Sequence, residues 1–132
     1  MVSQSFRATW TPRLLSILRI IVGLLFLEHG LSKYFGFPGP TPASFHAVSL
    51  LGLAGAIEII ASVLVMIGLF TRPAAFVASG EMAVAYFMVH FQKSFFPLLN
   101  GGDAAVLFCF VFLFLALEGA GPWSIDAMRE RA

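Results

Sequence analysis

The chain has 132 residues, of which 59% are hydrophobic and only 11% are charged, and its mean hydropathy is +0.91. This composition excludes an ordinary soluble domain, because such domains carry about 25% charged residues and a domain of this size still exposes roughly a third of its unfolded-chain surface. The net charge of +1 comes without a basic stripe, which excludes a nucleic-acid partner, so we expect membrane lipid to cover most of the surface.

Four apolar segments are predicted to cross a bilayer as helices. A helix needs about 20 residues to span the hydrocarbon layer, and the first three segments reach this length. The fourth is shorter, and packing against other helices or thinning of the bilayer would accommodate it. The predicted transmembrane helices cover residues 14–34, 47–70, 73–91 and 103–118. We therefore predict one domain, residues 1–132, with the fold class all-α and the architecture of a four-helix transmembrane bundle.

Turn-forming residues separate these segments. The Gly- and Pro-rich stretch 36–42 breaks the chain between the first and second segments. Residues 71–73, Thr-Arg-Pro, combine a capping hydroxyl with a proline in the first helical turn and predict a tight hairpin. Residues 100–103, Asn-Gly-Gly-Asp, form a turn that can also cap the fourth helix.

The positively charged residues predict the orientation, because loops on the cytoplasmic side carry an excess of Lys and Arg. Only Lys33 and Lys93 mark one side of the predicted bundle. The other side holds Arg7, Arg13, Arg72, Arg129 and Arg131. We expect both termini to be cytoplasmic, with chance asymmetry among so few charges as the alternative.

Ionisable residues inside apolar helices are costly in lipid and are therefore the best indicators of function. At about 100° per residue, each predicted helix places small residues beside a charged one, which is typical of close helix packing in membranes. The inward faces are predicted to be Arg19, Gly23, Phe26, Gly30 and Lys33 on the first helix, Ala54, Gly55, Glu58, Ala61, Ser62 and Val65 on the second, and Ala74, Ala78, Glu81, Ala85 and Gln92 on the third. We expect Glu58 and Glu81 to point into the bundle.

The depth of each residue suggests its partner. We expect an Arg19–Glu81 pair towards the cytoplasmic side and Glu58 near the middle of the membrane. An outer group would contain Glu28, His29 and Lys33, and His90 and Asn100 are secondary candidates at that side. These groups would form a buried polar site for a ligand or a proton path, or else they would only pair with one another and hold the helices in register. No metal-binding motif is present.

The motifs of this chain, in their order and spacing, resemble those of the DoxX family of small four-helix bacterial membrane proteins. The resemblance spans essentially the whole chain and is carried by Arg19-x-x-x-Gly23-x-x-Phe26-x-x-His29-Gly30-x-x-Lys33, Gly36-Phe37, Gly55-x-x-Glu58, Gly68-Leu69-x-Thr71-Arg72, Glu81-Met82-x-x-Ala85, Asn100-Gly101-Gly102 and Gly119-x-Gly121-Pro122-Trp123-Ser124-x-Asp126. Asp103 stands where the family more often has glutamate. The resemblance implies a multi-pass protein of the bacterial inner (plasma) membrane.

The family name derives from a subunit of a terminal quinol oxidase or thiosulfate:quinone oxidoreductase, so the resemblance also implies a quinone or a redox partner subunit. The leading hypothesis is an accessory, non-catalytic subunit of a quinone-linked oxidoreductase. In it, Glu58 or Glu81 would exchange the proton that accompanies quinone chemistry, with Arg19 holding the acid ionised and with His29 and Lys33 as outer contacts. The chain has no evident cofactor ligands of its own, so electrons would come from the partner.

Two other functions fit the same sequence. Some relatives in the family look like assembly factors or scaffolds, and a non-enzymatic scaffold would use its buried charges for packing alone. A transporter for a small solute or for protons is the third hypothesis. Four helices without inverted halves would have to form a homo-oligomer to transport a solute.

Overall fold

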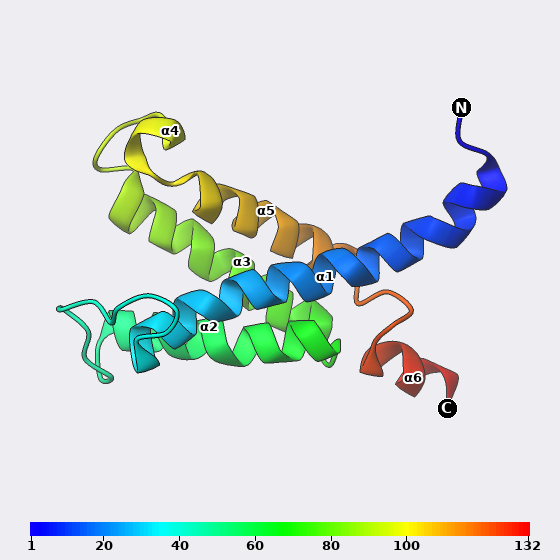
Figure 1. Ribbon diagram of the computed structural model, residues 1–132, viewed down its shortest axis with the longest axis horizontal. Helices are drawn as coiled ribbons and strands as arrows, with labels where there is room; N and C mark the ends of the chain where they lie inside the picture. Colours follow the sequence, from blue (N-terminus) through cyan, green and yellow to red (C-terminus); the bar gives the residue numbers. More distant parts are fainter.

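The computed structural model describes all 132 residues, and it is entirely helical (Figure 1). This confirms the predicted all-α class. The elements in chain order are α1 (Gln4–Phe35), α2 (Leu50–Ile67), α3 (Thr71–Ala85), the π-helical turn η1 (Tyr86–His90), α4 (Pro97–Asn100), α5 (Asp103–Glu118) and α6 (Ile125–Arg131).

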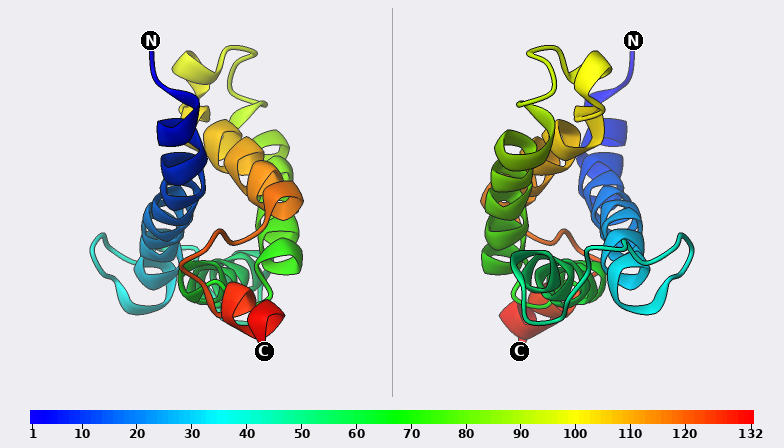
Figure 2. Two further views of the ribbon diagram at one scale, coloured as in Figure 1. Left: turned by 90° about the vertical axis from the view of Figure 1, so that its right-hand side faces the viewer. Right: turned by 90° about the vertical axis from the view of Figure 1, so that its left-hand side faces the viewer.

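The four longest helices run alongside one another in two antiparallel pairs. α1 packs on α2 and α3 packs on α5, while α2 and α3 join the two pairs through the short turn between them. The end views show α1 and α5 on different sides of the molecule, with α2 below (Figure 2). We call the end with residues 36–49 and α4 the loop end, and the end with both termini, the α2–α3 turn and α6 the terminal end (Figure 1).

The helix bounds differ from the predicted spans mainly in the first helix. α1 begins ten residues before the predicted start at residue 14, because Ser3 caps it by accepting a hydrogen bond from the N–H of Phe6. Its first turns, residues 4–13, are exposed and project beyond the other helices (Figure 1). α2 is shorter than the predicted 47–70, since Ser49 caps its start and Gly68, with a φ of 70°, ends it.

The later helices follow the sequence more closely. α5 covers residues 103–118, the range predicted for the fourth segment. The third segment, predicted as 73–91, divides into α3 and η1. Insertions of this kind into helices are rare and occur often at functional sites.

Glycines allow α1 and α2 to approach closely. A Cβ atom added to Gly30 would lie 2.9 Å from the carbonyl oxygen of Gly55 and 2.6 Å from Ile59 Cγ1. A Cβ on Gly23, seven residues earlier on the same face, would lie 2.5 Å from Met66 Cγ. The predicted inward face of α1 is thus confirmed, because Arg19, Gly23, Phe26 and Gly30 are all buried.

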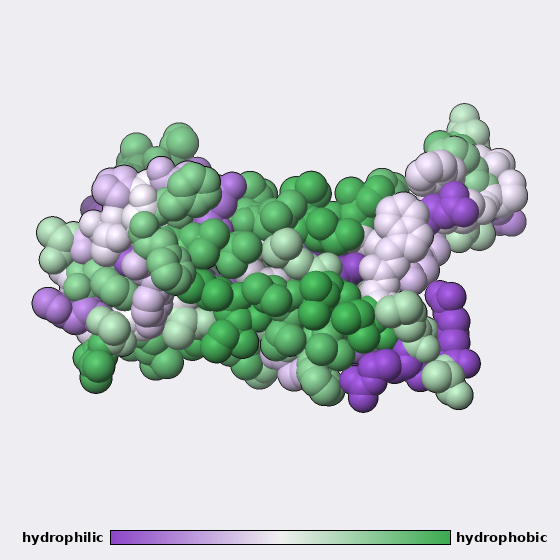
Figure 3. All heavy atoms as spheres, turned by 60° about the horizontal axis from the view of Figure 1, so that its bottom comes forward, coloured by the Kyte–Doolittle hydropathy of each residue, from purple (hydrophilic) through white to green (hydrophobic).

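The molecule has little hydrophobic core and a large apolar surface. On the face shown in Figure 3, apolar residues cover the middle of the molecule, and hydrophilic residues gather towards its ends. α1 and α2 are each long and apolar enough to cross a membrane. Side chains such as Ile60 and Phe110 are more than 60% exposed, an arrangement suited to lipid as the solvent.

Candidate functional site

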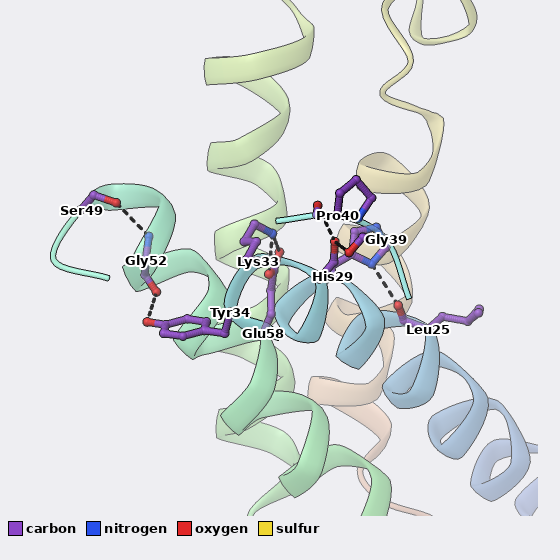
Figure 4. A network of polar contacts seen from close by, with 10 residues as sticks. Leu25, His29, Lys33, Tyr34, Gly39, Pro40, Ser49, Gly52 and Glu58 are labelled. Atoms are coloured by element: carbon purple, nitrogen blue, oxygen red, sulfur yellow. Dashed lines mark hydrogen bonds and ion pairs between the residues drawn. The ribbon is translucent and has the colours of Figure 1, made fainter. Parts of the chain in front are cut away.

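The candidate site is centred on an ion pair between α1 and α2. The ammonium nitrogen of Lys33 lies 2.6 Å from Oε1 and 2.5 Å from Oε2 of Glu58 (Figure 4). Glu58 is 1% exposed, which confirms its predicted inward direction. The two helices are antiparallel, so the last turn of α1 lies beside the first half of α2, and the Lys33 side chain extends from there to the carboxylate. Sequence analysis placed Lys33 in a separate outer group, but the structure brings it to Glu58.

A second carboxyl group borders this pair. Glu81, on α3, has a half-buried side chain whose Oε2 is fully buried and has no hydrogen-bond partner. It lies close enough to Glu58 and Lys33 for their charges to act on it. Ser62, one turn after Glu58 on α2, is completely buried and its Oγ also lacks a partner. The site therefore contains two carboxyl groups, one ammonium group and two unsatisfied polar atoms.

Unsatisfied buried polar atoms are rare in folded proteins, and each requires an explanation such as a ligand, water or a catalytic role. Glu81 Oε2 and Ser62 Oγ both lie within the helical bundle, on the helices that pack next to one another. No group of the chain satisfies either of them. The residues present are thus chemically suited to hold a polar headgroup and to exchange a proton with it.

The predicted Arg19–Glu81 pair is wrong. Arg19 is completely buried, but its guanidinium donates only to backbone carbonyl oxygens: those of Val65 and Met66 at 2.5 Å, Ala120 at 2.8 Å and Trp123 at 2.6 Å. Val65 and Met66 belong to the last turn of α2, whose carbonyl groups have no partners within the helix. Glu81 lies ten residues, or about 15 Å, along α3 from its start near this end, and is out of reach.

The outer group is brought together only in part. Glu28 and His29 are both exposed, and with Ser32 and Lys33 they line a cavity of about 290 Å³ whose other wall is the loop residues Pro38, Gly39 and Pro42. His29 Nδ1 lies 3.0 Å from the carbonyl oxygen of Leu25, and the ring packs edge-on against Phe108. Glu28 forms no ion pair.

The secondary candidates form a separate cluster at the loop end. His90 Nδ1 lies 3.0 Å from the carbonyl oxygen of Asn100, and the His90 ring stacks on Tyr86. The Asn100 side chain is buried and donates to the carbonyl oxygen of Ser94 at 2.9 Å and to Tyr86 Oη at 3.3 Å. These bonds tie η1 to the turn before α5, so the cluster shapes the loop end and lies apart from the Lys33–Glu58 pair.

A larger cavity lies away from all of these residues. It has a volume of about 840 Å³ and lies at the terminal end, where α6 meets the start of α3. Two of the charged groups that line it have partners: the Asp126 carboxylate accepts from the N–H groups of Phe70 and Thr71 at 2.9 Å, and Arg72 donates to carbonyl oxygens in the last turn of α5. We therefore place the candidate site at Lys33, Glu58, Glu81 and Ser62.

Asp126 acts here as a cap on α3 supplied from another helix. Partial burial works to raise the pKa of Asp126, but the backbone N–H groups of Thr71 and Phe70, together with Arg129, outweigh it and leave the pKa below its ordinary value. A carboxylate at a helix start also interacts favourably with the helix dipole. Sequence analysis assigned Asp126 no role, since its partners lie more than 50 residues away in the chain.

Comparison with known proteins identifies the family of the chain. The model of the DoxX family matches residues 14–91, which is more than half of the chain and includes Arg19, Lys33, Glu58 and Glu81. The chain belongs to the DoxX family. It is also 43% identical over 122 residues to an uncharacterized protein of Haemophilus influenzae, a match that covers 89% of this chain and 91% of the relative.

Two further relatives of this DoxX protein have informative names. A protein of Bacillus subtilis named "Putative oxidoreductase CatD" is 31% identical over 83% of this chain and 82% of its own length. An uncharacterized membrane protein of Mycobacterium tuberculosis is 26% identical over 95% of this chain and 91% of its own length. No solved structure matches the chain. This DoxX chain is therefore a membrane protein, and one of its relatives carries an oxidoreductase name.

Sequence analysis missed one member of the site. Ser62 was placed on the inward face of α2 but was not counted as a site residue. The available signal was its spacing: it lies four residues after Glu58, so the two side chains are neighbours on one helical face.

Proposed function

We propose that this DoxX protein is a multi-pass protein of the bacterial inner membrane, with α1, α2, α3 together with η1, and α5 as its four crossings. The apolar middle and hydrophilic ends in Figure 3 support this arrangement. The terminal end carries Arg7, Arg13, Arg72, Arg129 and Arg131, against Lys33 and Lys93 towards the loop end. The positive-inside rule then places the terminal end, with both termini, in the cytoplasm.

Within this membrane, the protein serves as an accessory subunit of a quinone-linked redox system. The observation that carries this proposal is the group of buried polar atoms around Glu58, of which Glu81 Oε2 and Ser62 Oγ lack partners. An ionisable group inside a membrane bundle is a functional candidate by default, because its burial is costly without a role. The oxidoreductase name of the Bacillus subtilis relative agrees with this choice.

Each residue of the site has a distinct task in this proposal. Ser62 and Glu81 offer the unsatisfied atoms that would hydrogen-bond the oxygens of a quinone headgroup. Lys33 holds Glu58 in place by bonding both of its oxygens. A quinone supplies two-electron chemistry that is coupled to proton uptake or release, and Glu81 is the carboxyl group free to exchange that proton. The electrons come from a partner subunit.

A specific observation favours a second function, that of a non-enzymatic scaffold. Arg19 joins α1, the end of α2 and residues 120–123 through four backbone carbonyl groups, which is a purely structural use of a buried charge. The Lys33–Glu58 pair could serve α1 and α2 in the same way. The two functions differ in what they require of Glu81, which contributes no hydrogen bond from Oε2 to the fold.

The test is to replace Glu81 with Gln in the native organism and to compare oxidant sensitivity and quinone-dependent respiration at equal protein abundance. The redox proposal predicts a phenotype close to that of the deletion strain, because Gln cannot exchange the proton. A strain with the E81Q variant at normal abundance and with normal respiration would favour the scaffold. Gly80→Ala is the matched control, since a Cβ atom at Gly80, the neighbouring position on α3, would contact nothing within 4 Å.

A further inference from the structure

The Lys33–Glu58 pair is buried, but it is not sealed from the loop end. The cavity of about 290 Å³ begins among exposed residues and is lined at depth by Lys33, whose side chain is 15% exposed. Its volume is large enough for several water molecules, since one water occupies about 30 Å³ in the liquid. Lys33 is thus the point at which this surface cavity meets the buried site.

The cavity is a built feature of the fold. Its outer wall is the loop after α1, which folds back over the end of that helix. Ser32 Oγ donates to the carbonyl oxygens of Gly39 at 3.1 Å and Pro40 at 3.4 Å, and Thr41 Oγ1 donates to the carbonyl oxygen of Ser32 at 3.2 Å. These hydrogen bonds hold the loop across the last turns of α1 and fix the shape of the cavity.

The residues that line the cavity include groups that exchange protons. A carbonyl oxygen can only accept, so the 3.0 Å contact of His29 Nδ1 with Leu25 requires the proton on Nδ1. Nε2 of the neutral ring is then the free acceptor. Glu28 contributes a carboxylate, and the groups that face Lys33 from the neighbouring helices are Glu58 on α2 and Glu81 on α3. Glu28, His29 and Lys33 thus line one cavity, and Lys33 is the member of that lining that contacts Glu58.

We infer that this cavity is a water-filled vestibule that opens only to the outer side of the membrane and connects the buried Lys33–Glu58 pair to it. Protons exchanged at the site therefore come from, or leave to, that side, with His29 Nε2 as the proton acceptor in the wall. The inference rests on the proposed function for its orientation and for the identity of the buried site. It adds the side of the membrane with which that site communicates.

Water access can be tested with single cysteines, because Cys109 is the only native cysteine. In a Cys109→Ala background, Ser32→Cys and Gly39→Cys place thiols in opposite walls of the vestibule. A Cβ atom on Gly39 would lie 3.5 Å from Ser32 Oγ, an ordinary contact, so this variant preserves the Ser32 hydrogen bonds. Leu25→Cys, seven residues before Ser32 on the same helix, is the lipid-facing control, and Thr9→Cys marks the terminal end.

Intact cells are treated with a thiol reagent that does not cross membranes. We expect S32C and G39C to be alkylated at least about tenfold faster than L25C, because a thiol in an apolar environment is held as the unreactive neutral form. T9C should react only after the membrane is permeabilised, so that the reagent reaches the cytoplasmic side. If both vestibule thiols react as slowly as L25C, although all react after denaturation, the vestibule does not exist. Labelling of S32C and G39C only from the side that labels T9C would overturn the orientation. Quinone binding is measured separately, so its failure would not affect this result.

Discussion

Lys33 on α1 and Glu58 on α2 form a bidentate ion pair, with the ammonium nitrogen 2.6 and 2.5 Å from the two carboxylate oxygens. Because the carboxylate is 1% exposed, neither partner can be removed without leaving an uncompensated charge between the helices. Breaking a buried pair of this kind costs about 3–5 kcal/mol of folding free energy. This pair therefore stabilises the packing of α1 on α2 at the proposed site.

The first prediction concerns the energetic coupling between Lys33 and Glu58. Lys33→Met should lower the thermal midpoint strongly, and the double variant with Glu58→Gln should recover most of the loss, because two neutral side chains leave no buried charge. Unfolding in detergent by fluorescence or circular dichroism measures both. Lys93→Met, at the other and exposed lysine, is the control and should change little. Strictly additive effects of the two substitutions would show that the pair is not formed.

The second prediction concerns Arg19. Arg19→Lys keeps the charge but replaces a planar fork of five donors by a single ammonium group, which cannot bond four carbonyl groups from two segments. We expect a loss on the order of 2–4 kcal/mol in unfolding free energy, from several charge-assisted hydrogen bonds. Arg13→Lys, at an exposed position over the Trp10 ring, should cost much less. Equal stability of the two variants would contradict the assigned role of Arg19.

The third prediction uses the glycines. Gly30→Val should separate α1 from α2 and destabilise the protein, since even a Cβ atom would lie 2.9 Å from a backbone oxygen of Gly55. Gly80→Ala should instead be neutral or stabilising by up to about 1 kcal/mol, because it adds helix propensity in open space. Thermal unfolding of the two variants side by side is the measurement. A stable G30V protein would mean that the close approach of α1 and α2 is not required.

The fourth prediction is a pH dependence at the terminal end, outside the membrane. The folded pKa of Asp126 lies below its ordinary value of 3.8, so its contribution to stability is present above that value and disappears as the pH falls through the folded pKa. Asp126→Asn should therefore lower the thermal midpoint at neutral pH, and the difference from wild type should shrink between about pH 5 and pH 2. Asp103→Asn, at the start of α5, is the control for the loss of an acidic side chain elsewhere in the chain. A constant difference across the pH range would refute the capping role.

Helix faces could be predicted from the sequence because their signal is local. The spacing of Arg19, Gly23, Phe26 and Gly30 follows the 3.6-residue period, and all four are buried as expected. Glu58 was likewise placed correctly. On α3 the buried face is centred on Ala78, Ser79 and Met82, so Glu81 lies at its edge, and only one oxygen of its carboxyl group is fully covered.

Charge pairing could not be predicted in the same way. Predicted depth placed Arg19 level with Glu81, but its guanidinium instead donates to carbonyl groups in the last turn of α2, which have no donors within the helix. Lys33 was assigned to the outer side from the position of its Cα atom, whereas its long side chain reaches a deeper carboxylate. The Asp126 cap depends on how α6 returns to α3, which no local pattern indicates.

The central claim is that Glu81 and Ser62 present their free polar atoms to a quinone headgroup inside the membrane. It is tested most directly by extracting and quantifying quinone from the purified wild-type protein and from the Ser62→Ala/Glu81→Leu variant, with G80A as control. The account predicts bound quinone, enriched over its share of the membrane lipid, in wild type and G80A, and its loss in the double variant with the thermal midpoint largely retained. The claim would be contradicted if the wild-type protein carried no more quinone relative to lipid than the bulk membrane does. Equal amounts of quinone in all three proteins would also contradict it.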